Sequence, residues 1–471
     1  MFVFINYITM KKILVIIVVF LTGFCTAQTS EFIGGEYIFP VSDQDCLSNF
    51  ERQQIHTEIN TNRQILEQQG ILKTAAQRAQ MPLVHPQFIW PVTKNPSAPY
   101  SNIWSISNHV DHNLSYPNQV QDYNCGNRTY DTSGGYNHSG IDIYTWPFSW
   151  YSFQNNYGWV IAAANGVIIA KSNGNFDMNC SMGSGNWNAV YIQHSDGSVA
   201  WYGHLKSGSL TSKPIGSTVI AGEFLGVIGS SGSSTGPHLH FEVYNSPNQL
   251  VDTYSGPCNN WTSSTDSWWL SQKPYQDPKI NAVLTHSAPP VFNTCPQTET
   301  TNLSNTFDSG SMVYAAFYLA DQLSGTSGTL QLKRPNASIA VSIPINFNTS
   351  YSSSYWYLPF NSDMFNQSGT WTLSLTYLGN TVNHTFSYGA LGIQDFADAF
   401  AVFPNPANDI LNIQSKKSLV IDKVQLYDMT GKQVYHNNGE TTVDIRALSG
   451  GIYMLNITSG DVVYKSKVVK N

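Results

Sequence analysis

The sequence predicts a mainly β protein, in which an antiparallel β domain is followed by further β-rich segments and preceded by a short helical one. Short apolar runs such as residues 167–170 and 189–192 have the length of strands. The dipeptide Asn165-Gly166 precedes one of these runs, where it favours a tight hairpin turn. Residues 369–377 alternate between apolar and polar side chains, as a half-buried strand of a β-sandwich does.

The composition is that of an exported protein. The chain has 471 residues, enough for about three domains. Charged residues make up only 11% of it, against roughly 25% in ordinary soluble proteins. The formal net charge is -7, and a nucleic-acid-binding protein needs a basic surface. The charge therefore argues against nucleic acid as a partner.

Residues 1–27 have the pattern of a secretion signal peptide. Lys11 and Lys12 precede an apolar run over residues 13–24, and small residues follow at 25–27, where cleavage is expected. The run is shorter than the roughly 20 residues that a spanning helix needs. We therefore expect no membrane span in the mature chain.

Residues 28–85 differ in character from the rest of the chain and resemble a pro-region. Residues 47–79 are predicted to be helical, with one loosely spaced apolar stripe that we expect to be buried. The alternative is a small structural cap that stays on the next domain, which we place at residues 86–290. The expected stripe consists of Phe50, Ile55, Ile59, Ile65 and Leu66.

Five cysteines follow the signal peptide. In an oxidising compartment some of them should form disulfides, but the sequence does not fix which ones pair. One of the five lies within residues 28–85, and removal of that segment would leave an even four. The five are Cys46, Cys125, Cys180, Cys258 and Cys295.

Three short motifs within the next domain bring together histidines and an aspartate. They are Asn-His-Ser-Gly-Ile-Asp at 137–142, Trp-Tyr-Gly-His-Leu at 201–205 and Gly-Pro-His-Leu-His-Phe-Glu at 236–242. Alternate side chains of a strand share a face, so His238 and His240 should point the same way. Catalytic zinc takes three nitrogen or oxygen ligands and keeps a fourth position open. The motifs therefore indicate a zinc hydrolase.

Together the three motifs resemble those of the lysostaphin/LytM-type zinc metalloendopeptidases, which cut short, often glycine-rich peptide links in bacterial cell walls. The resemblance covers roughly residues 88–290. It implies that His138, Asp142 and His240 bind one zinc ion, and that His204 and His238 are the catalytic histidines. It further implies that water activated by zinc attacks a peptide bond of peptidoglycan or of a glycine-rich extracellular protein.

Roles can also be predicted for several residues within and near the motifs. The chain lacks a His-Glu-x-x-His motif, so a histidine must take the role of the usual glutamate base. Tyr202 could offer its hydroxyl to the oxyanion or simply pack. Glu242 is expected on the face opposite to His240, as a group that supports the metal ligands or lies at the surface. Residues 109–112 hold two histidines and an aspartate, which we expect in a solvated loop and not at a second metal site.

The glycine-rich run at residues 226–236 does not predict a nucleotide site. No Lys-Ser or Lys-Thr pair follows it, and the next segment has the pattern of a strand instead of a helix. We expect a tight loop that delivers the strand of His238 and His240 to the site.

Residues 291–390 are predicted to form an immunoglobulin-like β-sandwich, because about one hundred residues with alternating strands fit that architecture. The segment contains no catalytic set, so binding or spacing is the expected role.

Residues 391–471 resemble a type IX secretion C-terminal sorting domain. The resemblance rests on Phe-Pro-Asn-Pro at 403–406, Gly-Gly-Ile-Tyr at 450–453 and lysines in the last strand. It implies a second small β-sandwich, recognition by the type IX secretion machinery, and a protein that is secreted or held at the outer cell surface.

Two further hypotheses remain open at this point. A non-catalytic cell-wall-binding or adhesin protein on the same fold is the alternative function, although the presence of all five site residues favours the enzyme. The second concerns latency: residues 28–85 are expected to cover the site until they are cut away. In the family resembled, a pro-segment asparagine can take the open zinc position, which makes Asn60 and Asn62 candidates here.

Overall fold

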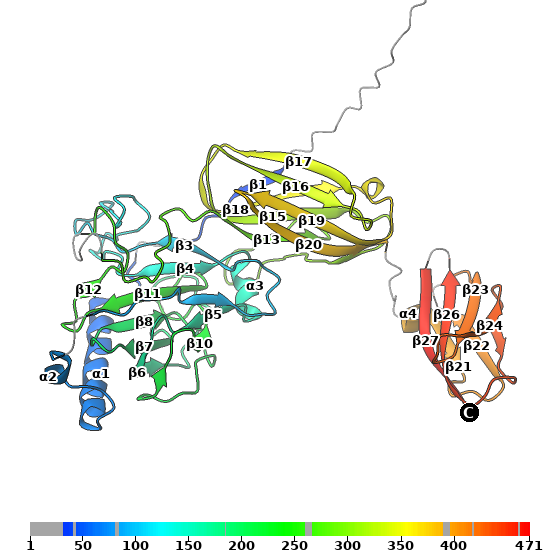
Figure 1. The fold of residues 1–471 in the computed structure, drawn as a ribbon, viewed down its shortest axis with the longest axis horizontal. Coiled ribbons are helices and arrows are strands. Elements are labelled where there is room, and N and C mark those ends of the chain that lie inside the picture. Colours follow the sequence, from blue (N-terminus) through cyan, green and yellow to red (C-terminus); the bar gives the residue numbers. More distant parts are fainter. Residues whose placement is uncertain are drawn as a thin grey trace, which may run out of the picture. The chain divides into compact units, whose positions relative to one another are not determined.

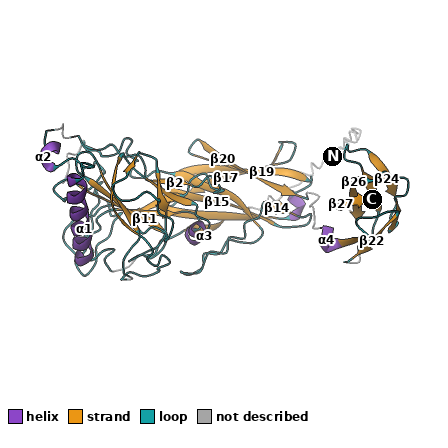
Figure 2. Ribbon diagram, turned by 90° about the horizontal axis from the view of Figure 1, so that it is seen from below, coloured by secondary structure: helices purple, strands orange, loops and turns teal. Residues whose placement is uncertain are grey.

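The computed structural model describes residues 32–40, 44–80, 84–183, 185–259, 266–389, 396–416, 419–459 and 462–471 (Figure 1). Strands dominate these residues, their pairing is almost entirely antiparallel and helices are few (Figure 2). The predicted mainly β class is therefore confirmed. The expected signal peptide, residues 1–27, lies outside the described residues. Within the part of the chain that is described, no helix is long and apolar enough to cross a membrane.

The three motifs lie on one eight-stranded sheet whose neighbouring strands are all antiparallel. One face packs on a large core that includes Ile143, Leu239 and Phe241. In sheet order the strands are β3 (Trp104–Asn108), β4 (Ile141–Thr145), β11 (His238–Tyr244), β8 (Val199–Gly203), β7 (Ala189–Gln193), β6 (Gly166–Ser172) and β9 (Thr218–Val219), and β12 (Leu250–Val251) pairs with β11.

Smaller elements complete this part of the molecule. A short helix, α3 (Ser149–Gln154), follows β4. A second sheet has three strands, β10 (Phe224–Val227), β5 (Gly158–Ile161) and β2 (Val92–Lys94).

The segment that precedes the motifs folds against the same sheet. It contains β1 (Ile33–Glu36), α1 (Asn49–Gln68) and α2 (Ala75–Arg78). Helix α1 begins at a capping box in which the Ser48 side chain accepts from the Glu51 N–H and the Glu51 side chain accepts from the Ser48 N–H. The helix packs on the face of the sheet opposite to the large core, where Ile59 and Leu66 join Trp201.

The single helix expected over residues 47–79 is thus two helices. Gly70 has a φ of +71°, a left-handed conformation that glycine adopts easily and that ends α1. The expected buried stripe is also only partly right. Ile59 and Leu66 are buried, whereas Phe50 is 67% exposed and Ile65 is 45% exposed.

Two sheets that share one core follow in the chain. The core includes Phe317 and Leu358 from one sheet and Trp371 and Leu375 from the other. The first sheet has the order β1, β18 (Tyr351–Phe360), β15 (Val313–Gln322) and β13 (Lys279–His286). The second has the order β14 (Thr306–Phe307), β20 (Asn380–Tyr388), β19 (Gly369–Tyr377), β16 (Thr326–Lys333) and β17 (Ile339–Phe347), and the 3₁₀ turn Ser362–Met364 precedes β19.

The boundary expected between residues 290 and 291 lies after a strand that pairs within the sandwich. Strand β13 lies before it in the sequence, yet β13 pairs with β15 in the sandwich. Strand β1 also enters that sheet, from the far end of the chain, by pairing with β18. The proline pair at 289–290 follows β13, so part of the sandwich precedes these prolines in the sequence. The remaining domain limits stay proposals.

The C-terminal segment has a core of its own, which includes Leu411, Leu426 and Leu455. A short helix, α4 (Phe396–Ala399), precedes its strands. One sheet consists of β21 (Phe400–Phe403), β22 (Ile410–Ser415) and β25 (Thr442–Asp444), and the other of β24 (Gln433–Asn437), β23 (Lys423–Tyr427), β26 (Gly451–Ser459) and β27 (Val462–Lys470).

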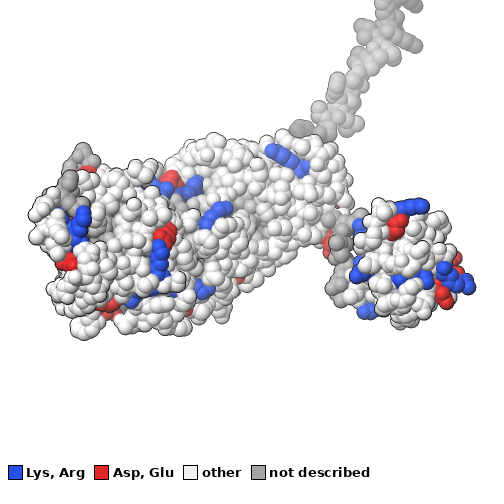
Figure 3. All heavy atoms as spheres, turned by 60° about the horizontal axis from the view of Figure 1, so that its bottom comes forward, with Lys and Arg blue, Asp and Glu red and all other residues white. Residues whose placement is uncertain are grey.

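Disulfides join Cys125 to Cys258 and Cys180 to Cys295. Cys46 is left as a free, buried thiol. Charged side chains are sparse on the face drawn in Figure 3, in keeping with the low charged fraction of the sequence.

Candidate metal centre

Strand pairing brings the three motifs to one place. His238 and His240 lie on β11, and Asp142 lies on the adjacent strand β4, directly opposite His240 in the antiparallel register. His240 also faces Gly203 on β8, so His204 follows at the end of that strand. His138 lies in the loop just before β4. The five predicted site residues therefore meet.

Three of them form a tight donor set. His138 Nε2 lies 3.1 Å from Asp142 Oδ2, and His240 Nδ1 lies 2.9 Å from Asp142 Oδ1. The three donor atoms all lie within 4.8 Å of one another. Gly140, inside the first motif, permits this approach, because a Cβ there would lie 2.6 Å from His240 Nε2.

Hydrogen bonds fix the other side of both imidazoles. His138 Nδ1 donates to the His109 carbonyl at 2.7 Å, and His240 Nε2 donates to Glu242 Oε2 at 2.9 Å. A carbonyl or carboxylate oxygen can only accept, so these nitrogens carry the proton. Metal-binding histidines are held in this way in general. His240 Nδ1 also donates to Asp142 Oδ1, and although burial opposes it, Cys46, Asp142 and Glu242 hold the pKa of His240 well above its ordinary value. A metal ion at this place would take the position of the Nδ1 proton.

A cation fits this donor set. His138 is fully buried, and its Nε2 has no hydrogen-bond partner although Asp142 is 3.1 Å away. A lone pair that faces a carboxylate oxygen is repelled unless a positive charge lies between them. Burial opposes the charge on Asp142, but the histidines around it, which include the hydrogen-bonded His240, outweigh burial and hold the pKa of Asp142 well below its ordinary value. The carboxylate is therefore ionised and available as a ligand.

His204 and His238 face the same centre from the other side. Their ring centroids are 4.4 Å apart, and His238 Nε2 lies 3.5 Å from Asp142 Oδ1. His204 Nδ1 donates to the Ser231 carbonyl at 2.6 Å, and His238 Nδ1 donates to the Gly236 carbonyl at 2.8 Å. The glycine-rich loop thus supplies the carbonyls that orient both rings and keep the proton on Nδ1, so that each Nε2 is the nitrogen that can accept one.

Both of these imidazoles are neutral. Burial, together with His238 and His240, holds the pKa of His204 well below its ordinary value. Burial also lowers the pKa of His238, although Asp142 opposes that shift. Neutral imidazoles can accept a proton, as a general base must.

Glu242 lies on the same face as His240, which corrects the expectation of the opposite face. Residues i and i+2 of a strand share a face, and the carboxylate of Glu242 holds His240 from behind. Its other oxygen accepts from Arg52 of α1 and from Tyr244. Burial would raise the pKa of Glu242, but Arg52 outweighs it and lowers the pKa to about 2. The supporting role expected for Glu242 agrees with these contacts.

Tyr202 packs and does not reach the centre. Its hydroxyl accepts from the Ala163 N–H at 2.8 Å, inside the large core. Tyr202 and His204 are two residues apart, and on a regular strand their side chains would share a face. They do not do so here, because His204 has a φ of +60°. This left-handed conformation is uncommon for a residue other than glycine, and it turns the imidazole out of the strand toward the centre.

The cluster at residues 109–112 is buried, contrary to the solvated loop that was expected. His109 and Asp111 are each only 1% exposed. The His109 carbonyl orients His138, and Asp111 accepts from the Gln121 N–H at 2.9 Å. His112 Nε2 pairs with Asp252 Oδ2 at 2.8 Å. The cluster therefore supports the loop behind the centre.

Sequence reasoning missed one residue of the centre, Cys46. Its Sγ lies 3.2 Å from His204 Nε2, and burial raises the pKa of the thiol. Asn60 and Asn62, the residues expected as candidates for the open zinc position, make their hydrogen bonds elsewhere. Asn60 accepts from Arg63 at 2.9 Å, and Asn62 donates to the Ile169 carbonyl at 2.9 Å. Nothing in the spacing around Cys46 indicated its place.

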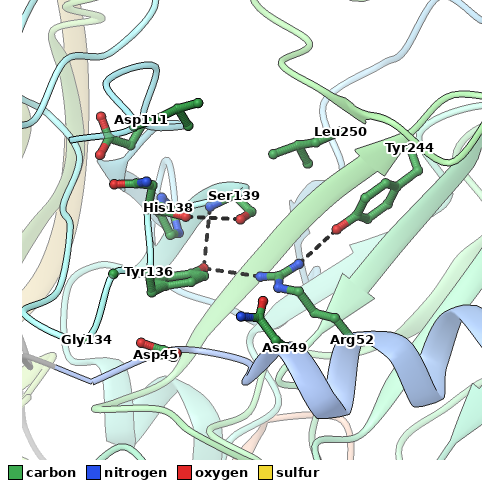
Figure 4. A pocket seen from close by; sticks show the side chains of 13 residues that line it. Asp45, Asn49, Arg52, Asp111, Gly134, Tyr136, His138, Ser139, Tyr244 and Leu250 are labelled. Carbon is green, nitrogen blue, oxygen red and sulfur yellow. Dashed lines mark hydrogen bonds between the residues drawn. The ribbon is translucent and has the colours of Figure 1, made fainter. Parts of the chain in front are cut away.

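A cavity of about 240 Å³ lies beside the centre (Figure 4). His138 and Ser139 line one side of it, and Arg52 from α1 closes the other. Arg52 donates to the hydroxyls of Tyr136 at 3.3 Å and Tyr244 at 2.9 Å. All five site residues are at most 4% exposed. The preceding segment therefore contributes part of the lining of this cavity beside the buried centre.

Residues 137–253 match peptidase family M23, and residues 401–471 match the secretion system C-terminal sorting domain. The chain thus carries an M23 peptidase domain of the LytM type together with a type IX sorting domain, as the motifs predicted. The matched peptidase segment includes all five site residues. The sorting domain indicates type IX secretion to the cell surface or the extracellular space.

Individual relatives agree with that assignment. The chain is 39% identical over 84 residues to the DD-carboxypeptidase/endopeptidase Mpg of Neisseria meningitidis serogroup B. The aligned stretch covers 18% of this chain and 16% of the relative. The chain is 36% identical over 81 residues to the peptidoglycan DD-endopeptidase ShyC of Vibrio cholerae, which covers 17% of this chain and 16% of the relative. The chain therefore spans about a sixth of the length of these curated relatives.

Among solved structures, the chain is similar to a dimeric latent PorU from Porphyromonas gingivalis, at 14% identity over 65% of this chain and 34% of that one. The TM-score is 0.16, so this likeness supports no inference.

Proposed function

We propose that this protein is a secreted zinc metalloendopeptidase that hydrolyses peptide bonds in peptidoglycan cross-links or in glycine-rich extracellular protein. One observation carries the proposal: His138, Asp142 and His240 direct three donor atoms at one point, with both imidazoles held from behind. Two neutral nitrogens and one carboxylate are the donor set of a catalytic zinc site. His138, Asp142 and His240 would hold the ion.

When bound, zinc would lower the pKa of water to about 7 and polarise the scissile carbonyl. The chain supplies the remaining chemistry through His204 and His238. Each carries its proton on Nδ1, against a carbonyl, so Nε2 is the atom that accepts a proton from the attacking water. The protonated imidazole can then stabilise the developing oxyanion or protonate the leaving amine.

The proposed substrates rest on the relatives and on the sorting domain. The relatives include a peptidoglycan DD-endopeptidase, which supports a peptide link of the bacterial cell wall. The sorting domain sends the protein outside the cell, which supports a foreign cell wall or an extracellular protein as the target.

The test is a comparison of two substrates. Protein that begins near Pro86 is incubated with isolated cell walls and with elastin-like protein, and new termini are mapped by mass spectrometry. We expect cleavage of at least one of them by the zinc-loaded protein and none by the Asp142→Ala variant. Intact substrates in the presence of fully zinc-loaded protein would contradict the proposal.

A further inference from the structure

Cys46 is the free thiol of the described chain, and it lies against the histidines of the metal centre. It is 2% exposed, and its Sγ is 3.2 Å from His204 Nε2. The donor atoms of Cys46, His204 and His240 all lie within 4.8 Å of one another. His240 belongs to both donor sets, so the sulfur lies next to the set formed with His138 and Asp142.

A second observation, independent of the thiol, points to a cation at this place. His138 Nε2 is fully buried and has no hydrogen-bond partner, and it faces Asp142. Only a proton or a metal ion between these two donors relieves their repulsion. Thiolate sulfur is among the preferred zinc ligands, and a closed zinc site has four. A metal held by His138, Asp142 and His240 would still lack a fourth ligand.

We propose that Cys46 binds this metal as the fourth ligand and thereby keeps the precursor latent, an inference that rests on the proposed function. The thiol binds as a thiolate, so its proton leaves to solvent and the sulfur takes the position that water would otherwise occupy. The closed site has no open position. Removal of the segment that holds Cys46 opens it.

The chain is anchored before Cys46. Strand β1 pairs with β18, Tyr37 stacks on Trp146 with centroids 4.6 Å apart, and the Pro40 carbonyl accepts from the Thr235 hydroxyl at 2.7 Å.

The chain is also anchored after Cys46. Ser48 caps α1, and Arg52 forms a buried ion pair with Glu242, the residue that holds His240. Both anchors place the thiol at the centre in advance, so little conformational freedom is lost when it binds.

The experiment uses the full precursor loaded with cobalt(II), which reports its ligands by absorption. A thiolate ligand gives a charge-transfer band that nitrogen and oxygen ligands do not give. We expect this band in the unsubstituted precursor and its loss in Cys46→Ser and Cys46→Ala, each with one metal per chain. We also expect zinc to leave both variants for a chelator roughly tenfold faster or more, since a ligand is lost.

Ser48→Ala is the matched control. It removes the helix cap two residues away and loosens the same segment, but it keeps the thiol, so the band should remain. A precursor that binds one cobalt without a thiolate band would overturn the role of Cys46 and leave the proposed function standing. A precursor and variants that all bind no metal would instead contradict the proposed function. Circular dichroism spectra identify any variant that fails to fold.

Discussion

Each imidazole of the centre owes its orientation to an acceptor behind it. His138 is held by a backbone carbonyl, His240 by Glu242, and His204 and His238 by carbonyls of the glycine-rich loop. The centre is thus arranged before any ligand arrives, and a ligand binds without the cost of ordering these side chains. Hydrogen bonds to main-chain carbonyls also fix which nitrogen is free.

Loss of one donor should remove the metal. We expect the Asp142→Ala protein to bind far less than one zinc per chain, because two neutral imidazoles remain without the carboxylate that bridges them. Elemental analysis after dialysis measures this. Asp308→Ala, at an exposed position of the sandwich, is the control and should bind zinc like the parent protein. Full zinc occupancy in Asp142→Ala would refute the ligand assignment.

His204→Ala should separate binding from turnover. The residue faces the centre but is not one of the three proposed ligands, so we expect zinc to stay bound. Turnover of a peptide by protein that begins near Pro86 should fall by roughly 10²-fold or more, the effect of losing an acid-base or oxyanion group. His238→Ala should behave alike. Turnover equal to that of the parent protein would show that the imidazole has no part in the reaction.

The sequence could predict part of this centre and not the rest. Alternation along one strand places His238 with His240, and the same rule, rightly applied, places Glu242 with them. The rule fails at His204, whose left-handed backbone no spacing reveals. Cys46 could not be predicted, because tertiary contacts alone bring it to His204 from 158 positions away.

At the scale of elements, apolar patterns indicate where a strand lies more reliably than they indicate which strand it pairs with. The alternation over residues 369–377 is strand β19, as predicted. Strand β13 has apolar residues at 280 and 282–284, but these do not say which sheet the strand joins, and the structure pairs it with β15. Helix α1 was predicted by its apolar spacing, whereas its end depends on one left-handed glycine, Gly70.

Strand β13 ends in a histidine that should make the sandwich sensitive to acid. His286 is fully buried, and its Nδ1 donates to the Thr301 carbonyl at 2.6 Å. Burial lowers its pKa from 6.5 to about 4. Between pH 6.5 and 4 the unfolded chain therefore binds a proton that the folded chain does not, so stability falls as pH falls through that range. The loss amounts to about 3 kcal/mol when complete.

Thermal unfolding followed between pH 7 and 4 measures this effect. We expect the free energy of unfolding to fall less steeply in His286→Gln, which cannot take up the proton. His436→Gln, at an exposed position, is the matched control and should keep the slope of the parent protein. Identical slopes in the parent protein and in His286→Gln would show that this histidine does not cause the acid sensitivity.

For the whole molecule, export and catalysis should be separable. The sorting domain has its own core, and the described part of it shows no group of three metal-binding side chains. A chain that ends near Leu391, which lies outside the described residues, should therefore accumulate in the producing cell and cleave normally once it is purified and trimmed. Immunoblots of cells and medium follow the protein. Efficient release of this truncated chain into the medium would show that the sorting domain is not needed for export.

We expect the segment before residue 86 to hold the molecule in a closed state that its removal opens. It contributes Ile59 and Leu66 to the core over the sheet, and Arg52 to the buried carboxylate of Glu242. Its removal should therefore lower the unfolding temperature, because apolar surface is exposed and an ion pair is lost. The same removal should open a centre whose five residues are almost inaccessible in the precursor.

Trimmed protein that begins near Pro86 should accordingly be more active and less stable than the precursor. We expect turnover of a small peptide to rise roughly tenfold or more, because apparent activity scales with the fraction of molecules whose site is open. A permanent cap predicts the loss of stability without the gain in activity, so both quantities must be measured on the same preparation. A precursor nicked after residue 85 with the segment still bound is the control, since it keeps Cys46 at the centre and should stay inactive. Equal activity of precursor and trimmed protein would exclude latency and identify the segment as a structural cap.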